Sequence, residues 1–314
     1  KRSISNEIVE LELAQKILKR FEIDDAVITI NQNKNGLINH TFELSTHVNK
    51  YILQRINTQV FPNYQQGLEN IILIKKWLKQ NNYQYEFPSP LQNQYLNFDN
   101  KLWRLLPFVK NSKSINKVSN TREVEEAVKC MSEFYRSIQG FPIEKLNVTI
   151  PNFHSGEHKI MTFNKALKNS SELRKKNAEP LILEIEKNLK ILTEWDEVCR
   201  KLPKCIVHYD TKINNFLFKK NTNKVIALID LDTLMPGCVL SDIGDMIRTY
   251  SNTLGEESKD ISKVTCNKNI VAAILNGFKG SLTIMETKYL NFGGLAITFM
   301  QSVRFLADYL NNDI

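Results

Sequence analysis

The sequence predicts an α+β protein in which a small lobe built on an antiparallel sheet precedes a larger, mainly helical lobe. Three consecutive stretches near the N-terminus alternate apolar and polar residues, whereas helical spacing dominates after Pro107. The chain has 314 residues, of which 42% are hydrophobic, and this is enough for one large or two medium-sized domains. We therefore expect one lobe at residues 1–107 and a second at residues 108–314.

The first lobe should open with a helix over residues 6–21, where apolar residues recur at helical spacing. Three strands follow, and the connectors "NKNG" and "HVN" between them suit hairpin turns. A second helix and a further hairpin complete this lobe. The predicted strands are 26–32, 39–46, 50–56, 94–98 and 101–109, and the predicted second helix is 65–80.

The second lobe should consist mainly of helices. Thr121 can cap a helix that reaches residue 138, and Pro180 is expected to open a helical segment that ends near residue 202. Residues 147–177 mix Pro, Gly and polar residues and predict no regular element. The closing helices are predicted at 241–253, 269–280 and 287–310.

Composition argues against several classes of protein. No apolar run approaches 18 residues, so no membrane span is expected. The five cysteines include no CxxC pair, which favours a reduced, cytoplasmic protein and disfavours a zinc site. The net charge is +8, but the basic residues are spread along the chain, so we expect a solvated surface and no nucleic-acid partner. The number of subunits cannot be deduced.

Polar residues concentrate in the apolar stretch "IVHYDTKINNFLF" at 206–218, and "KVIALIDLD" follows at 224–232. A hairpin formed by the two stretches would bring Asn215 close to Asp230. An amide oxygen beside a carboxylate suits Mg²⁺, which commonly bridges substrate phosphates. Asp210 adds a carboxylate that can orient a hydroxyl and accept its proton. Together these groups predict phosphoryl transfer from a nucleotide to an alcohol.

These motifs resemble a known family. The spacing of Asp210 and Asn215 matches the protein-kinase catalytic loop H-R-D-x-x-x-x-N, with Asp230 at a following strand end. The chain resembles the aminoglycoside phosphotransferase superfamily, and within it the N-acetylhexosamine 1-kinase branch. The matching stretches are "GLINHTFEL", "YILQRIN", "LWRLLPFV", "HYDTKINNFLF", "IDLDTLMPG", "DIGDMIR" and "RFLADYL".

The resemblance implies a two-lobed protein-kinase-like fold and roles for the residues of the second lobe. Asp210 would be the catalytic base or hydroxyl-orienting residue, with Lys212 in contact with phosphate. Asn215 and Asp230 would bind Mg²⁺. Asp232 would contact a second metal ion or a sugar hydroxyl, or only cap the loop that follows it. His208 would brace the catalytic loop, as would the carboxylates of "SDIGDMIR" at 241–248.

In the first lobe, the resemblance implies that "NKNGLIN" covers the phosphates through backbone N–H groups. Gly36 is its one glycine, and Asn39 and Thr41 follow the pattern of the branch. The third strand would normally carry a phosphate-binding lysine, but here it offers Arg55 or Gln54. These two side chains should point to opposite faces of the sheet, and we expect Arg55 to face the cleft. The nucleotide base would bind at the hinge "RLLPFV" through backbone groups and apolar contacts, which involve Leu106 and Phe108.

The acceptor pocket should lie in the helical lobe. Arg304 matches an arginine that the branch uses toward the sugar, although a helix salt bridge with Asp308 is an alternative. Tyr309 is a candidate for an aromatic sugar contact. The predicted activity is ATP- and Mg²⁺-dependent phosphorylation of the anomeric hydroxyl of N-acetylglucosamine or N-acetylgalactosamine. Alternatives are an aminoglycoside, choline or homoserine kinase, and a pseudokinase that only binds nucleotide.

Overall fold

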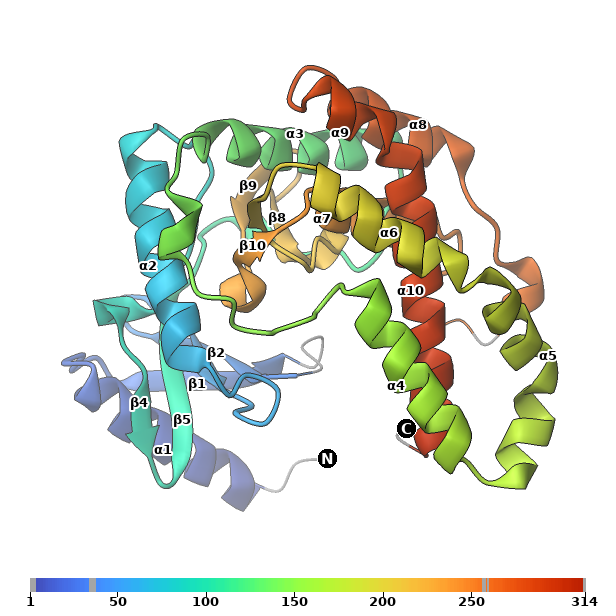
Figure 1. Ribbon diagram of the computed structural model, residues 1–314. Coiled ribbons are helices and arrows are strands. Elements are labelled where there is room, and N and C mark those ends of the chain that lie inside the picture. The colour runs from blue at the N-terminus through green and yellow to red at the C-terminus, as the bar shows by residue number, and fades with distance from the viewer. Residues whose placement is uncertain (1–3, 34–37, 256–257, 259, 313–314) are drawn as a thin grey trace.

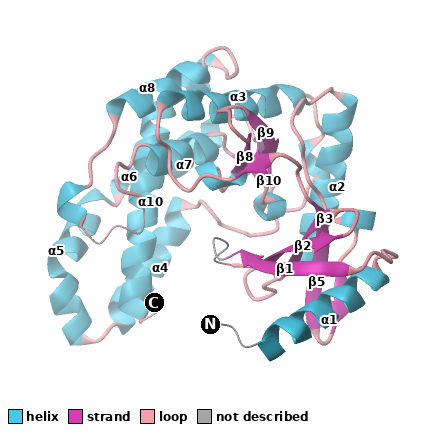
Figure 2. Cartoon of the chain, turned by 180° about the vertical axis from the view of Figure 1, so that it is seen from behind, coloured by secondary structure: helices cyan, strands magenta, loops and turns pink. Residues whose placement is uncertain are grey.

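The computed structural model describes residues 4–33, 38–255, 258 and 260–312. The chain forms two lobes, with a five-stranded sheet in the first and a group of helices in the second (Figures 1 and 2). The second lobe also contains a three-stranded and a two-stranded sheet, both small. In the described ranges, no helix is both long enough and apolar enough to cross a bilayer.

The first lobe is an antiparallel sheet covered on one face by helix α1. The strand order is β1-β2-β3-β5-β4, so a three-stranded meander (β1 to β3) joins a hairpin (β4 and β5) through the pairing of β3 with β5. Side chains alternate between the faces of the sheet, and one face packs Leu53, Trp103 and Leu105 against Ile17 and Leu18 of α1. The elements are α1 (Ile4–Arg20), β1 (Val27–Asn33), β2 (His40–Thr46), β3 (Lys50–Arg55), β4 (Leu96–Phe98) and β5 (Lys101–Pro107).

Helix α2 (Tyr64–Gln80) comes from the first 107 residues but packs in the core of the second lobe. Its apolar stripe, formed by Ile71, Ile74 and Leu78, is buried there. The buried Asn70 side chain adds two hydrogen bonds, from Nδ2 to the carbonyls of Asn147 (2.8 Å) and Leu234 (3.0 Å). Helix α2 is therefore fixed to the larger lobe, while the sheet packs on α1.

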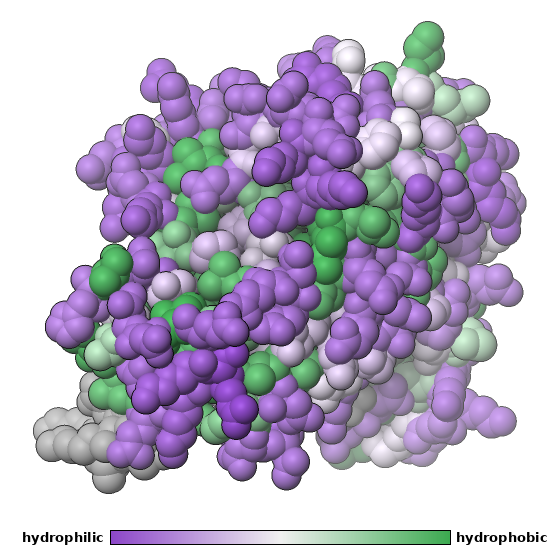
Figure 3. Space-filling model, turned by 90° about the vertical axis from the view of Figure 1, so that its left-hand side faces the viewer, coloured by the Kyte–Doolittle hydropathy of each residue, from purple (hydrophilic) through white to green (hydrophobic). Residues whose placement is uncertain are grey.

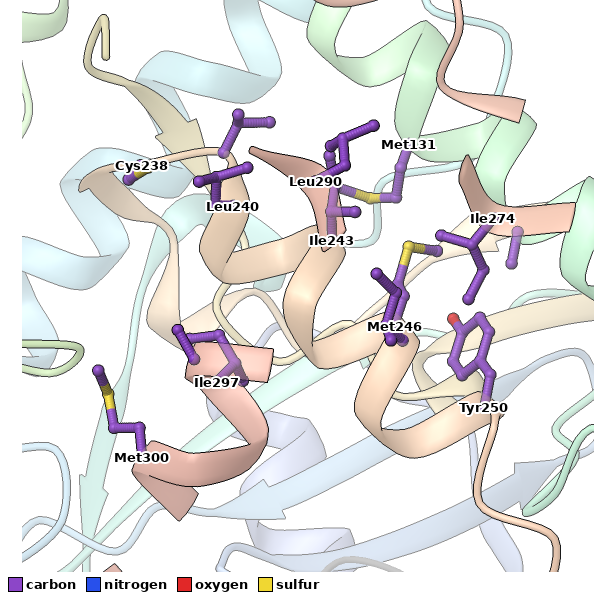
Figure 4. Close-up of a cluster of buried hydrophobic side chains, with 14 of the residues drawn as sticks. Met131, Cys238, Leu240, Ile243, Met246, Tyr250, Ile274, Leu290, Ile297 and Met300 are labelled. Atoms are coloured by element: carbon purple, nitrogen blue, oxygen red, sulfur yellow. The ribbon is translucent and has the colours of Figure 1, made fainter. Parts of the chain in front are cut away.

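The second lobe is organised around helices α7 (Leu240–Tyr250) and α10 (Leu290–Asn311), which pack closely against each other. In Figure 4, Ile243 and Met246 of α7 lie in a buried cluster with Ile274 and Ile297. The remaining helices and strands are α3 (Thr121–Ser137), α4 (Gly156–Asn169), α5 (Glu172–Asn188), α6 (Lys190–Lys201), α8 (Lys268–Gly277), α9 (Ile284–Lys288), β6 (Ser112–Lys113), β7 (Cys205–Val207), β8 (Phe216–Lys219), β9 (Val225–Leu228) and β10 (Met235–Gly237).

Some sequence predictions for this lobe are wrong in detail. The cap of α3 is Asn120, whose side chain accepts the Glu123 N–H, so Thr121 is already the first helical residue. Pro180 lies inside α5, a helix that begins at Glu172 after the cap Ser171. The unassigned stretch 147–177 contains α4 and the start of α5. The helices predicted from apolar spacing are present in this lobe, whereas several predicted helix boundaries differ from the observed ones.

Figure 3 looks onto the side of the molecule where α2 lies in Figure 1. Hydrophilic residues cover most of this face, and hydrophobic ones are scattered among them. This distribution is typical of a solvated surface.

The crossing of α7 and α10 generates a stability prediction. A Cβ added at Gly244 would lie 2.6 Å from the Gly293 carbonyl oxygen and 2.6 Å from Cγ1 of Ile297. We expect Gly244→Ala to lower the free energy of unfolding by about 1–3 kcal/mol, because the two helices must move apart.

Urea denaturation followed by circular dichroism measures this change. Gly67→Ala in α2 is the matched control, because its new Cβ would have no neighbour closer than 3.9 Å. Alanine there should leave stability unchanged or raise it by up to about 1 kcal/mol. Equal stability of Gly244→Ala and the parent protein would contradict the packing argument.

Candidate active site

The hairpin predicted from the sequence is present and brings the site residues together. Strands β8 and β9 pair antiparallel, with Phe216 opposite Leu228. Just beyond this pair, the N–H of Ile229 donates to the carbonyl of Asn215 (2.9 Å). Asn215 and Asp230 therefore lie together at the open end of the hairpin.

Asp210 and Asn215 are directly hydrogen-bonded. Nδ2 of Asn215 donates to the Asp210 backbone carbonyl (2.8 Å) and to its carboxylate Oδ2 (3.1 Å). Since the amide nitrogen of Asn215 is used toward Asp210, its amide oxygen is the atom that can serve a cation. The second carboxylate oxygen of Asp210 can face a substrate.

A buried network braces the loop that carries Asp210. The Asp242 carboxylate accepts hydrogen bonds from the N–H groups of His208 (2.8 Å) and Tyr209 (2.7 Å) and from the hydroxyl of Tyr135 (2.7 Å). The imidazole of His208 lies between the Ile229 carbonyl and the Asp210 N–H. Since that N–H donates to Nδ1, Nε2 is the ring nitrogen that can donate to the Ile229 carbonyl. His208 thus has the bracing contacts that the sequence predicted.

The backbone is left-handed at two points of this site. Tyr209 has φ 65° and Asp230 has φ 61°, and neither residue is a glycine. Such conformations cost free energy and persist only when neighbouring contacts enforce them, and they are frequent at functional sites. Here they occur directly before Asp210 and at Asp230 itself.

The site concentrates negative charge. Asp230 still has solvent-exposed surface, yet enclosure by the protein, together with the charges of Asp232 and Asp210, raises its pKa to about 7. The positive charge of Arg104 acts in the opposite direction. A divalent cation would offset this repulsion. The carboxylate of Asp230 and the amide oxygen of Asn215 are also the hard oxygen donors that Mg²⁺ prefers, so these residues fit such an ion.

Arg55 does not lie on the face of the sheet for which it was predicted. That residue lies opposite Trp103 in the strand pairing and shares the face of Leu53, which packs on α1. Gln54 points to the other face, where its Oε1 accepts from Nε of Arg104 (2.8 Å). The prediction that Arg55 faces the cleft is therefore wrong, and Gln54, the stated alternative, occupies that side.

Sequence reasoning missed Arg104. This residue of β5 is 3% exposed and forms a bidentate salt bridge with Asp232, in which Nη2 lies 2.8 Å from Oδ2. Asn39 donates to the same carboxylate oxygen (3.1 Å). These contacts occupy Asp232, so the structure gives no support for a metal or sugar contact there. An arginine within the apolar run "LWRLL" was the available signal, because such a residue is rarely buried without a partner.

The other residues predicted to bind nucleotide lie in different surroundings. Gly36 is outside the described residues. Thr41 accepts a hydrogen bond from the Gln54 amide (2.9 Å), so it belongs to the polar network on the cleft side. Leu106 shares the face of Arg104 by strand alternation. The ring of Phe108 lies under the ammonium group of Lys50, 5.3 Å from its centroid.

Arg304, which was predicted to contact the acceptor, makes contacts with residues of its own helix, α10. It pairs with Asp308 (3.6 Å), donates to Gln301 (2.8 Å) and covers the ring of Phe305. The ring of Tyr309 lies under Arg174 of α5, and its carbonyl accepts from the same guanidinium (2.6 Å). Lys212 is close enough to Asp245 to lower the pKa of that carboxyl, although burial dominates and raises it.

His154 packs against the loop that carries Asp210. Its ring stacks on Phe153 (4.9 Å between centroids) and meets the edge of Tyr209 (5.1 Å). Burial, followed by the charges of Lys159, Arg248 and Arg304, lowers the pKa of His154 to about 3. Basic groups from α4, α7 and α10 thus gather beside the loop that carries Asp210.

A comparison with known families identifies this arrangement. A model described as the phosphotransferase enzyme family, APH, matches residues 29–262, which is well over half of the chain. The chain belongs to the APH family. Asp210, Asn215 and Asp230 all lie within the matched residues, as does the sheet from Thr29 onward.

Solved structures of other APH enzymes share the fold. Spectinomycin phosphotransferase APH(9)-Ia, solved with ADP and spectinomycin, has a TM-score of 0.61 at 12% identity, over 95% of this chain and 86% of that one. Aminoglycoside 2'-phosphotransferase-IIIa, solved with GDP, has a TM-score of 0.60 at 13% identity, over 96% of this chain and 93% of that one. For the macrolide 2'-phosphotransferase MphH of Brachybacterium faecium, the values are 0.53 and 11%, over 96% and 98%. Identities this low show the fold alone, and they confirm the kinase-like architecture that the sequence predicted.

The low pKa of His154 makes stability depend on pH. The unfolded chain takes up a proton at this residue as the pH falls below 6.5, whereas the folded chain does so only near pH 3. Stability is therefore lost as the pH falls through this window. Between pH 7.5 and 5.5, the parent protein should lose about 1 kcal/mol more than His154→Phe.

Urea denaturation at the two pH values checks this expectation. His47→Gln, at an exposed turn, serves as the control and should follow the parent protein. A parallel loss of stability in the parent and in His154→Phe would show that this ring is protonated in the folded state.

Proposed function

We propose that this APH phosphotransferase transfers the γ-phosphoryl group of ATP to the anomeric hydroxyl of an N-acetylhexosamine. The observation that carries the chemistry is the Asp210–Asn215 hydrogen bond on a braced loop, with the carboxylate of Asp230 beside it. Such a site works by holding reactants in place and by stabilising charge, and both need rigid groups. The solved relatives hold ADP or GDP, which supports a nucleotide as the phosphoryl donor.

Each residue has a defined part in the reaction. Asp210 orients the acceptor hydroxyl and takes its proton while the hydroxyl oxygen forms a bond to the γ-phosphorus. The bond from that phosphorus to the β–γ bridging oxygen breaks, and the nucleoside diphosphate leaves. Asn215 and Asp230 would hold Mg²⁺, which neutralises phosphate charge when bound. Lys212 adds a positive charge near the transferred group.

The charges on the acceptor side favour a neutral sugar over a polycation. Lys159, Arg248 and Arg304 all act on His154, beside the catalytic loop. An aminoglycoside carries several ammonium groups, which these cations disfavour, although Asp245 and Asp308 offset part of the charge of Arg248 and Arg304. An N-acetylhexosamine is uncharged and offers hydroxyl and carbonyl oxygens that Lys and Arg can hydrogen-bond. Arg304 and Tyr309 remain our predicted acceptor contacts, and Arg304 has the stronger support because it is one of these cations.

The role of Asp210 predicts the effect of a conservative substitution. Asp210→Asn keeps an oxygen that can accept from Asn215 but cannot take a proton. We expect turnover to fall by about 10²–10⁴-fold while nucleotide affinity stays within about twofold.

Steady-state kinetics and equilibrium binding of ADP measure the two quantities. Asp260→Asn, at an exposed loop position, is the matched control and should retain full activity. Near-full turnover of Asp210→Asn would exclude this residue as the base.

A panel of acceptors tests the substrate assignment. It contains N-acetylglucosamine, N-acetylgalactosamine, choline, homoserine, spectinomycin and a 2'-hydroxyl aminoglycoside, each assayed for ATP-dependent phosphorylation. We expect kcat/KM to be highest for an N-acetylhexosamine, with the product a 1-phosphate by phosphorus NMR. Preference for an antibiotic would overturn the sugar assignment and retain the phosphotransferase chemistry. Removal of Mg²⁺ with a chelator should abolish transfer to every acceptor.

A further inference from the structure

Arg104 is a buried cation on the side of the sheet that faces the catalytic carboxylates. Its guanidinium donates to Gln54 through Nε, to Asp232 through both Nη atoms and to the Tyr95 hydroxyl through Nη1 (3.4 Å). Gln54 lies opposite Arg104 in the pairing of β3 with β5. The guanidinium plane is therefore fixed from two sides, by an amide on one and by a carboxylate on the other.

Asp232 belongs to the short segment that follows Asp230, and this segment is held by both lobes. From the first lobe, Arg104 and Asn39 bind the Asp232 carboxylate. Asn70 of α2 also donates to the Leu234 carbonyl (3.0 Å). From the catalytic loop, the His208 carbonyl accepts from the Thr233 hydroxyl (2.5 Å). The position of Asp230 relative to the sheet therefore depends on contacts made within the next four residues.

We propose that the Arg104–Asp232 pair is a positioning device that sets the distance between the sheet and the metal-binding carboxylate Asp230. The third strand contributes the uncharged Gln54 to this face of the sheet, opposite Arg104. Gln54 orients Arg104, and Arg104 holds Asp232, so the sheet acts on the metal site through a chain of two side chains. The bidentate geometry fixes both distance and angle, which a lysine could not do.

The inference rests on the proposed function in one respect: Asp230 must take part in Mg²⁺-dependent nucleotide binding. The test therefore measures ADP affinity in the absence of any acceptor, once with saturating Mg²⁺ and once with a chelator. The ratio of the two affinities is the gain due to Mg²⁺. A wrong acceptor assignment would leave this gain unaffected.

Four variants separate positioning from other roles. Arg104→Gln and Asp232→Asn should each reduce the Mg²⁺-dependent gain about tenfold while affinity in the chelator stays within about twofold. Each single variant already removes the Arg104–Asp232 pair. The double variant should therefore lose no more of the Mg²⁺-dependent gain than either single variant. Arg104→Lys should recover part of the gain. Lys175→Gln, which breaks an exposed ion pair on α5, is the charge-matched control and should behave like the parent.

Two results would overturn the proposal. If Asp232 instead bound the metal ion directly, Asp232→Asn would lose the gain but Arg104→Gln would keep or increase it, since the carboxylate would be released. Additive losses in the double variant would show independent roles. Circular dichroism melting establishes that each variant is folded at the assay temperature. If Arg104→Gln does not fold, Arg104→Lys and Asp232→Asn still distinguish positioning by the Arg104–Asp232 pair from direct binding of the metal ion by Asp232.

Discussion

The carboxylate of Asp242 is the contact on which the geometry of the catalytic loop depends. It accepts two backbone N–H groups from His208 and Tyr209, and these bonds hold the left-handed turn that places Asp210. Burial raises the pKa of Asp242, while the hydrogen bonds it accepts lower it. Asp242 lies in the first turn of α7, so the accuracy of the loop depends on where that helix is packed.

The position of α7 depends in turn on small residues. Gly244 of α7 faces Gly293 of α10 so closely that any side chain would collide. This contact lets the two helix backbones approach and aligns the Asp242 end of α7 with the catalytic loop. A chain of contacts thus runs from the α7–α10 crossing to the Asp210 carboxylate. The position of Asp210 therefore depends on the packing of α7 against α10 in the core.

Patterns that depend on neighbouring residues were predictable from the sequence. The β8–β9 hairpin follows from strand alternation and a polar turn, and it alone suffices to place Asn215 beside Asp230. The contacts of Asp232 were not predictable, because its partner Arg104 is 128 residues away, on strand β5 of the first lobe. The face of Arg55 was also ambiguous, since alternation gives opposite faces to Gln54 and Arg55 without saying which one meets the cleft. Register against β5 decides this, and register is a property of the folded sheet.

The packing of α2 limits how the structure can open to admit a nucleotide. Because Ile71, Ile74 and Leu78 are buried in the larger lobe, swinging α2 outward would expose three large side chains to water, at about 1.5–3 kcal/mol each. Movement of the sheet relative to α2 would have to break the contacts that Arg104 and Asn39 make with Asp232. The first 107 residues thus contribute to two separate cores, that of the sheet with α1 and that of the larger lobe with α2, although they are continuous in the chain.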